Sequence, residues 1–153
     1  TRVDDTFFAF QNQHEEENAT TDIGVYIRKN RYFFCWIEAK RLPTPNRNVR
    51  DECEYVIVDK EKFKGNGGIQ RFKECKHAPE LSYSIMIGYI QDGNSVDFWL
   101  AKVNGWITDL ATPDTFWSDE DRLNKCSSTK CNRFLSVHKR TNNTTITLHH
   151  YWI

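Results

Sequence analysis

The apolar run at residues 32–37, which reads Tyr-Phe-Phe-Cys-Trp-Ile, is the feature that most limits how this chain can fold. A continuous apolar run rich in aromatic residues is typical of a β-strand that is buried on both faces. A second β-type run, residues 23–28, precedes it, and only Lys29, Asn30 and Arg31 separate the two. A connection this short favours a β-hairpin. We therefore expect residues 23–28 and 32–39 to pair as neighbouring strands of a sheet.

Further signals along the chain predict a mixed α/β fold. β-type runs lie at residues 7–13, 82–91, 133–139 and 144–152, and a shorter one lies at 55–59, where a helix over 48–58 is the alternative. Helices are expected at residues 69–77, at 95–110 and from Ser118 toward Cys126. In the second of these, Ser95 is placed to cap a stripe of apolar residues at three-to-four spacing. This order predicts a central mixed β-sheet flanked by helices, with a C-terminal β-hairpin.

Composition limits the class of protein. The 153 residues suit one domain spanning 1–153, and 39% of them are hydrophobic, which is too many for a disordered chain. Lys plus Arg and Asp plus Glu number 21 each, so net charge alone indicates no polyanionic partner. The uncharged stretch at residues 81–91 is about half as long as a membrane span, and no membrane partner is expected.

The cysteines bear on the compartment. Five cysteines stand at unrelated spacings, and an odd number does not suit a fully paired disulfide framework. This favours a reduced, cytoplasmic protein. Sequons at Asn18, Asn142 and Asn143 keep open the alternative of a secreted interaction domain.

One group of charged residues stands at the ends of the predicted hairpin strands. Asp22 precedes the first strand, and Glu38-Ala39-Lys40 closes the second. Strand pairing would bring Asp22 and Glu38 to one end of the sheet, and alternation places Glu38 and Lys40 on the same face. Two carboxylates and the Ala39 carbonyl form a hard-oxygen site suited to Mg²⁺ or Mn²⁺, beside which Lys40 could position a water. The plain alternative is a turn cap at Asp22 and a surface ion pair of Glu38 with Lys40.

Thr21-Asp22 and Glu38-Ala39-Lys40, sixteen residues apart across the hairpin, resemble the two half-motifs of the PD-(D/E)XK nuclease superfamily. The resemblance runs over residues 7–90 and implies a restriction-endonuclease-like fold. It implies that Asp22, Glu38 and Lys40 are catalytic, and that Asp22, Glu38 and the Ala39 carbonyl hold Mg²⁺ or Mn²⁺. Thr21 stands where the family has proline.

The segment at residues 67–72, Gly-Gly-Ile-Gln-Arg-Phe, and the β-type run that follows it resemble the helix and fourth strand of the same superfamily. In many such nucleases this helix adds a glutamine near the metals, which implies a catalytic role for Gln70. Related nucleases usually carry a helix with a glutamate before the first strand, and only six residues precede Phe7 here.

The function that the resemblance implies is metal-dependent hydrolysis of phosphodiester bonds, with DNA as the expected substrate. A setting in bacterial or phage defence goes with it, in which the chain acts as a homodimer or as a subunit of a larger defence complex. The alternative is a catalytically inactive member of the same fold that binds nucleic acid or protein, which the short segment before Phe7 motivates.

Basic residues are concentrated in two segments. Residues 122–140 hold six Lys or Arg and no acid, and residues 60–77 hold six against two acids. Such flanks can contact phosphates and position a nucleic acid without reading its sequence. The predicted phosphate contacts are Arg41, Arg47, Arg71, Lys73, Arg133, Lys139 and Arg140.

The two C-terminal strands carry a serine and three histidines. Ser136 and His138 fall on one face of their strand, and His149 and His150 lie on the next strand. A Ser/His nucleophile would need a partner acid and a glycine-flanked elbow, and the sequence reveals neither. We therefore expect these histidines to belong to the core or the sheet surface.

Overall fold

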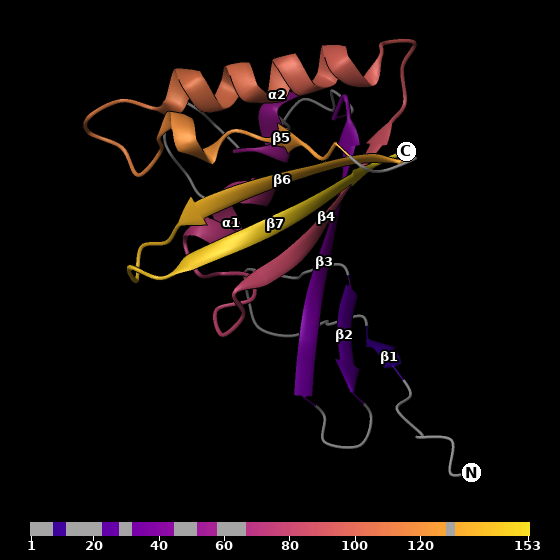
Figure 1. Cartoon of the computed structure of the whole chain (residues 1–153), viewed down its shortest axis with the longest axis vertical. Helices are drawn as coiled ribbons and strands as arrows, with labels where there is room; N and C mark the ends of the chain where they lie inside the picture. The colour runs from indigo at the N-terminus through magenta and orange to yellow at the C-terminus, as the bar shows by residue number, and fades with distance from the viewer. Residues whose placement is uncertain (1–7, 12–22, 28–31, 45–51, 58–66, 128–130) are drawn as a thin grey trace.

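A mixed sheet of seven strands, accompanied by two α-helices and two 3-10 turns, makes up the described part of the protein (Figure 1). The computed structural model describes residues 8–11, 23–27, 32–44, 52–57, 67–127 and 131–153. The elements in chain order are β1 (Phe8–Gln11), β2 (Ile23–Ile27), β3 (Tyr32–Leu42), η1 (Glu52–Tyr55), α1 (Gly68–Lys73), β4 (Tyr83–Ile90), α2 (Val96–Leu110), η2 (Asp119–Asp121), β5 (Asn124–Lys125), β6 (Asn132–Lys139) and β7 (Thr145–Trp152).

The strand order in the sheet is β1-β2-β3-β4-β7-β6-β5. The first three strands form an antiparallel meander, whereas β4 runs parallel to both of its neighbours, β3 and β7. Parallel neighbours need a crossover, which η1 and α1 form between β3 and β4. β6 and β7 pair antiparallel as the predicted C-terminal hairpin. The predicted mixed α/β fold with a mixed sheet is confirmed.

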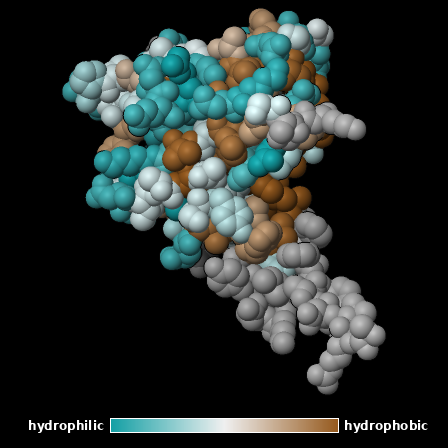
Figure 2. Space-filling model, in the orientation of Figure 1, coloured by the Kyte–Doolittle hydropathy of each residue, from teal (hydrophilic) through white to brown (hydrophobic). Residues whose placement is uncertain are grey.

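Both helices lie against the same face of the sheet. Alternate residues of β4, β6 and β7 are buried, because they point toward the helices. Trp99 of α2 and Phe72 of α1 belong to one core cluster with the strand residues Met86 and Leu148. The intervening strand residues keep part of their surface, and Figure 2 shows brown and pale side chains in the middle of this other face.

The hairpin of β2 and β3 is confirmed, but the expectation that residues 32–37 are buried on both faces is wrong. Cys35 is buried, whereas Phe34 is 38% exposed and Trp36 and Ile37 are half-buried. Ile37 lies on the face that the two described helices leave uncovered, so it remains partly accessible, whereas Trp36 packs against the core cluster from the other face.

α2 forms as its sequence predicts. The Ser95 hydroxyl accepts a hydrogen bond from the backbone N–H of Phe98 at 3.1 Å and so caps the helix. Its apolar stripe is buried, with Trp99, Val103 and Ile107 facing the core. Full burial of one such side chain contributes about 1.5–3 kcal/mol.

α1 is a short helix held close to its neighbours by two glycines. It ends earlier than the predicted 69–77, although Ile69 and Phe72 are fully buried as expected. A Cβ on Gly68 would lie 2.5 Å from the terminal methyl of Met86, and a Cβ on Gly67 would overlap the backbone of Ile57. Only glycine therefore allows this approach.

Two expected elements differ in the structure. Where a strand was expected at 55–59, Glu52–Tyr55 forms the 3-10 turn η1 and residues 55–57 are buried. The helix expected from Ser118 is reduced to the 3-10 turn η2, capped reciprocally by Ser118 and Asp121, after which the chain enters β5. In the first case, the apolar run at residues 55–57 is too short for its periodicity to distinguish a strand from a 3-10 turn.

No helix within the described ranges is both long and apolar enough to cross a membrane. All five cysteines fall in these ranges, and no disulfide joins any two of them. The strands expected at 7–13, 82–91 and 133–139 are confirmed as β1, β4 and β6, with bounds that shift by one to two residues.

Candidate functional site

The predicted site lies where β2 begins its pairing and β3 continues past it. Ile23, the first residue of β2, pairs with Ile37 of β3. Beyond Ile37, β3 runs on beside β4 and presents Glu38 and Lys40 on one face. Asp22 directly precedes Ile23 but lies outside the described residues, so its predicted approach to Glu38 stays a prediction.

Lys40 links two buried carboxylates. Its Nζ lies 2.8 Å from Oε1 of Glu38 and 3.5 Å from Oε1 of Glu54. The Glu38 side chain is 1% exposed and that of Glu54 is 10% exposed. Sequence reasoning missed Glu54, because η1 brings it to Lys40 across a connection that follows no strand or helix period.

Arg71 and His77 close this cluster from the side of α1. Arg71 Nη1 lies 4.0 Å from Glu38 Oε1, and His77 Nε2 lies 3.5 Å from Glu38 Oε2. Burial, together with the charges of Arg71 and Lys40, lowers the pKa of His77 to about 3. His77 is therefore neutral at pH 7, so the carboxylates of Glu38 and Glu54 face two cations. We call these five residues the Glu38 cluster.

The Glu38 cluster can supply hard oxygen ligands to a divalent cation. Mg²⁺ is usually held by one or two carboxylates together with waters and substrate phosphates. Glu38 and Glu54, both beside the Lys40 ammonium, are carboxylates of this kind, and the Ala39 carbonyl is the predicted backbone ligand. Asp22 is the further predicted ligand. Among the described residues alone, no group of three or more His, Cys, Asp or Glu side chains forms a metal site. Carboxylate oxygens are the donors that Mg²⁺ and Mn²⁺ prefer, and the metal site itself stays a prediction.

Gln70 lies on the same helix as Arg71 but lines a different space. Its side-chain nitrogen donates to Glu74 Oε1 at 2.7 Å, and the residue is buried. With Trp117 and other residues it lines a cavity of about 270 Å³ beside α1. Arg71, the next residue of α1, lies 4.0 Å from Glu38. The catalytic role predicted for Gln70 stays a prediction.

The residues predicted to contact phosphate lie in different environments. Arg41 and Lys139 are exposed at strand ends, and Arg133 is half-buried on β6. Arg71 belongs to the Glu38 cluster. Arg47 lies outside the described residues.

Lys73 and Arg140 are both buried, and the structure contradicts the prediction that they contact phosphate. Lys73 Nζ donates to Asp121 Oδ1 at 2.6 Å. The Arg140 guanidinium donates at 2.7–3.2 Å to the backbone carbonyls of Phe72, Ala78, Pro79 and Leu81. Arg140 thus ties the chain between α1 and β4 to the C-terminal hairpin.

Ser136 and His138 take part in a chain of hydrogen bonds through the core. His138 Nε2 lies 2.6 Å from Ser136 Oγ, and His138 Nδ1 lies 2.7 Å from Asp121 Oδ1. Sequence reasoning missed this acid, because η2 brings it to β6 from a separate element. The order is that of a hydrolase triad, but Ser136 is 1% exposed, so its hydroxyl is buried away from solvent. The prediction that the histidines of these strands belong to the core or the sheet surface is confirmed for His138, which is buried.

The hydrogen-bond chain continues from Ser136 across β7. His150 Nε2 lies 2.7 Å from Ser136 Oγ, and His150 Nδ1 lies 2.7 Å from the Tyr55 hydroxyl. Trp152 Nε1 donates to the same hydroxyl at 2.9 Å. We call this set, from Trp152 through Asp121 to Lys73, the core relay.

Charges in the core relay are matched. Burial lowers the pKa of both His138 and His150, so both rings are neutral at pH 7. Burial alone would raise the pKa of Asp121, but the hydrogen bond from His138 and the hydrogen bond and charge of Lys73 outweigh it and hold the pKa below its usual range. Donors and acceptors can then alternate in one direction from Trp152 to the Asp121 carboxylate. The relay is a satisfied polar network that fixes the core.

Comparison with protein-family models, with curated proteins and with solved structures finds no match for this chain.

Proposed function

We propose that the chain is a metal-dependent nuclease of the PD-(D/E)XK type that hydrolyses phosphodiester bonds, with DNA as its substrate. The observation that carries the proposal is the buried Glu38–Lys40 pair, which follows directly on the described pairing of β2 with β3 at Ile23 and Ile37. Ile23 pairs with Ile37. The next residue toward this end is Asp22 in the chain before β2 and Glu38 on β3.

The order of elements supports the same proposal. An antiparallel meander, a helix and a further strand beside β3 is the order that the resemblance implies, and β1, β2, β3, α1 and β4 follow it. A restriction-endonuclease-like fold is therefore part of the proposal. Partners that go with it are DNA and either a second copy of the chain or a larger defence complex.

Burial argues against a plain surface ion pair. An exposed pair contributes about 0–1 kcal/mol and leaves both charges in water. Here the Glu38 and Lys40 side chains are 1% and 15% exposed, and Glu54 and Arg71 bring two further charges to the same place. Burying several charges is costly unless they are paired or ligated, which favours a site over an incidental contact.

The roles follow from the positions of the residues. Asp22, Glu38 and the Ala39 carbonyl would hold Mg²⁺ or Mn²⁺, with Glu54 as a second carboxylate near Lys40. The cation, when bound, supplies a Lewis acid that offsets the charge developing on the phosphate. The Lys40 ammonium would hydrogen-bond the attacking water and orient it for in-line displacement. Arg71 would neutralise a phosphate oxygen at the edge of the cluster.

A cleavage assay with a metal control tests the proposal. The purified chain is incubated with supercoiled plasmid and with circular single-stranded DNA in Mg²⁺ or Mn²⁺, with EDTA as the control. We expect nicking or degradation that EDTA abolishes and that Asp22→Asn and Glu38→Gln each reduce at least about 100-fold. Full activity in both variants would overturn the assignment of the site. DNA binding without any cleavage would support the alternative of a catalytically inactive member.

A further inference from the structure

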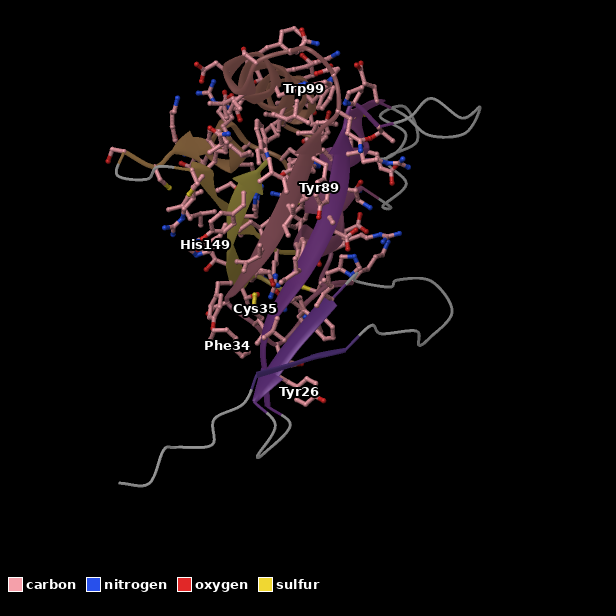
Figure 3. The ribbon with its side chains drawn as sticks, turned by 90° about the vertical axis from the view of Figure 1, so that its right-hand side faces the viewer. Tyr26, Phe34, Cys35, Tyr89, Trp99 and His149 are labelled. Carbon is pink, nitrogen blue, oxygen red and sulfur yellow. The ribbon has the colours of Figure 1, made fainter. Side chains whose placement is uncertain are left out.

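The sheet face that points away from α1 and α2 has a composition unlike that of a neutral surface. We call it the open face and define it by the odd-numbered residues of 37–41, 83–89, 133–139 and 147–151. None of these side chains is in the buried class, whereas the even-numbered residues of β4, β6 and β7 between them are mostly buried. Figure 3 shows Phe34 and His149 on the same side of the sheet.

Charge on the open face has a single sign. Arg41, Arg133 and Lys139 lie on it, and none of its described positions holds Asp or Glu. The chain as a whole has equal numbers of acidic and basic residues, so this segregation is local. A surface with cations and no acids complements a polyanion.

Two tyrosines on the open face are each placed beside an arginine. Tyr89 is 39% exposed and pairs in register with Arg41 on β3. Tyr151 pairs in register with Arg133 on β6, whose guanidinium lies 5.8 Å from the tyrosine ring centroid. Ile87 is opposite Tyr151 and two residues before Tyr89, so the two rings stand diagonally on adjacent strands.

Exposed aromatic rings beside cations are the chemistry that holds single-stranded nucleic acid. Unpaired bases stack on tyrosine rings whatever the sequence, while arginine and lysine neutralise the adjoining phosphates. A duplex keeps its bases stacked inside and offers no free base to a flat sheet surface. A protein partner would not require the exclusion of acids from the face. We propose that the open face binds single-stranded nucleic acid, with Tyr89 and Tyr151 as stacking platforms and Arg41, Arg133 and Lys139 as phosphate contacts.

This proposal goes beyond the proposed nuclease activity and does not rest on it. Glu38 and Lys40 lie on the other face of β3, against α1, so the open face is separate from the candidate site. Binding there needs no divalent cation. It therefore survives in EDTA and in Lys40→Gln, and its success or failure is measured independently of cleavage.

Fluorescence anisotropy with labelled oligo(dT) and oligo(U) in EDTA tests the proposal on the full chain. We expect Tyr89→Ala to weaken binding about tenfold or more and Tyr89→Phe, which keeps the ring, to bind like the wild type. Arg41→Ala should weaken binding and reduce the slope of log K against log salt by about 0.7, whereas Tyr89→Ala should leave that slope unchanged. Phe98→Ala on α2, where the ring is 45% exposed, and Arg122→Ala are the matched controls and should bind normally.

Several outcomes would overturn the proposal. They are no binding of either oligonucleotide at up to about 100 µM protein in low salt, equal losses in Phe98→Ala and Tyr89→Ala, or tighter binding of a duplex of equal length that Tyr89→Ala weakens as well. Analytical sedimentation of the same proteins tests whether a second copy of the chain occupies the open face. A dimer that Tyr89→Ala dissociates, without oligonucleotide binding, would make the open face a contact between two copies of the chain instead. Comparison of oligo(U) with oligo(dU), which differ only in the 2′-hydroxyl, shows whether that group contributes.

Discussion

Lys40 Nζ lies 2.8 Å from Glu38 Oε1, and both side chains leave the same face of β3 two residues apart. The pair sits against α1 rather than in solvent, with Glu54 and Arg71 as further charged neighbours. Removing one partner of a buried ion pair leaves the other charge uncompensated. Substitutions at this pair therefore affect both stability and chemistry, and tests of function here need variants that keep the shape of the side chain.

The core relay predicts a large difference between two aspartates of one turn. Asp121→Ala leaves Lys73 and His138 buried without their acceptor, so the free energy of unfolding should fall by about 3–5 kcal/mol. Asp119→Ala removes an exposed carboxylate from the same turn and should change the free energy of unfolding by less than about 0.5 kcal/mol. Urea unfolding followed by circular dichroism measures both. Similar losses in the two variants would contradict the relay.

Acid should destabilise the protein from about pH 6.5 downward. Burial lowers the pKa values of His77, His138 and His150 in the folded state, whereas in the unfolded chain these groups titrate near 6.5. The unfolded state then binds more protons, and each histidine contributes a slope of about 1.4 kcal/mol per pH unit. For His77 this window runs from 6.5 down to about 3. The lowered pKa of Asp121 acts in the same direction as the pH falls through its unfolded value.

Urea unfolding at pH 7, 6 and 5 measures the acid effect. His77→Gln should reduce the pH dependence of the free energy of unfolding by the equivalent of about one proton, because a glutamine does not titrate. Stability that is constant or rises between pH 6.5 and 5 would contradict the neutral state of these rings.

Arg140 should prove a structural residue without a role in nucleic-acid contact. Arg140→Lys cannot reproduce a fork that donates to four backbone carbonyls, so the melting temperature should fall by several degrees. Differential scanning calorimetry measures this loss. Below the transition, oligonucleotide binding should match that of the wild type. A specific loss of binding in a protein that melts normally would restore Arg140 to the phosphate contacts.

Alanine substitutions at two glycines should change the stability of the protein in opposite directions. Gly67→Ala places a methyl group on the backbone of Ile57, which cannot move without shifting the segment, so several kcal/mol of stability should be lost. Gly105→Ala on α2 meets no atom within 4 Å and should stabilise by about 0.5–1 kcal/mol through helix propensity. Paired denaturant curves compare the two changes. A neutral Gly67→Ala would mean that α1 does not pack as closely as described.

Local patterns predict much of this fold. The β2–β3 hairpin, the cap of α2 at Ser95 and the C-terminal hairpin all follow from spacing and turn residues in a short window. Glu38 and Lys40 share a face for the same reason, since strand alternation is a local property. The strand predicted at residues 55–59 is wrong, because a buried apolar run of three residues, 55–57, has no period that distinguishes a strand from a turn.

Contacts across crossovers are the part that the sequence does not reveal. Glu54 reaches Lys40, Asp121 reaches His138 and Arg140 reaches the α1–β4 segment only because distant elements pack together. Their spacings in the chain are set by connection lengths, which carry no periodic signal. The sequence pattern therefore predicts that Arg140, a basic residue in a basic segment, lies on the surface. In the structure it is 1% exposed.

The most direct measurement is the rate of plasmid cleavage in Mg²⁺ by the wild type, Lys40→Gln and Lys125→Gln. Lys40→Gln keeps a flexible polar side chain beside Glu38 but removes its charge, whereas Lys125, on the edge strand β5, lies in an exposed ion pair with Asp97. We predict cleavage by the wild type and Lys125→Gln, and a loss of at least about 100-fold in Lys40→Gln while it remains folded. Undiminished cleavage by folded Lys40→Gln would contradict the account.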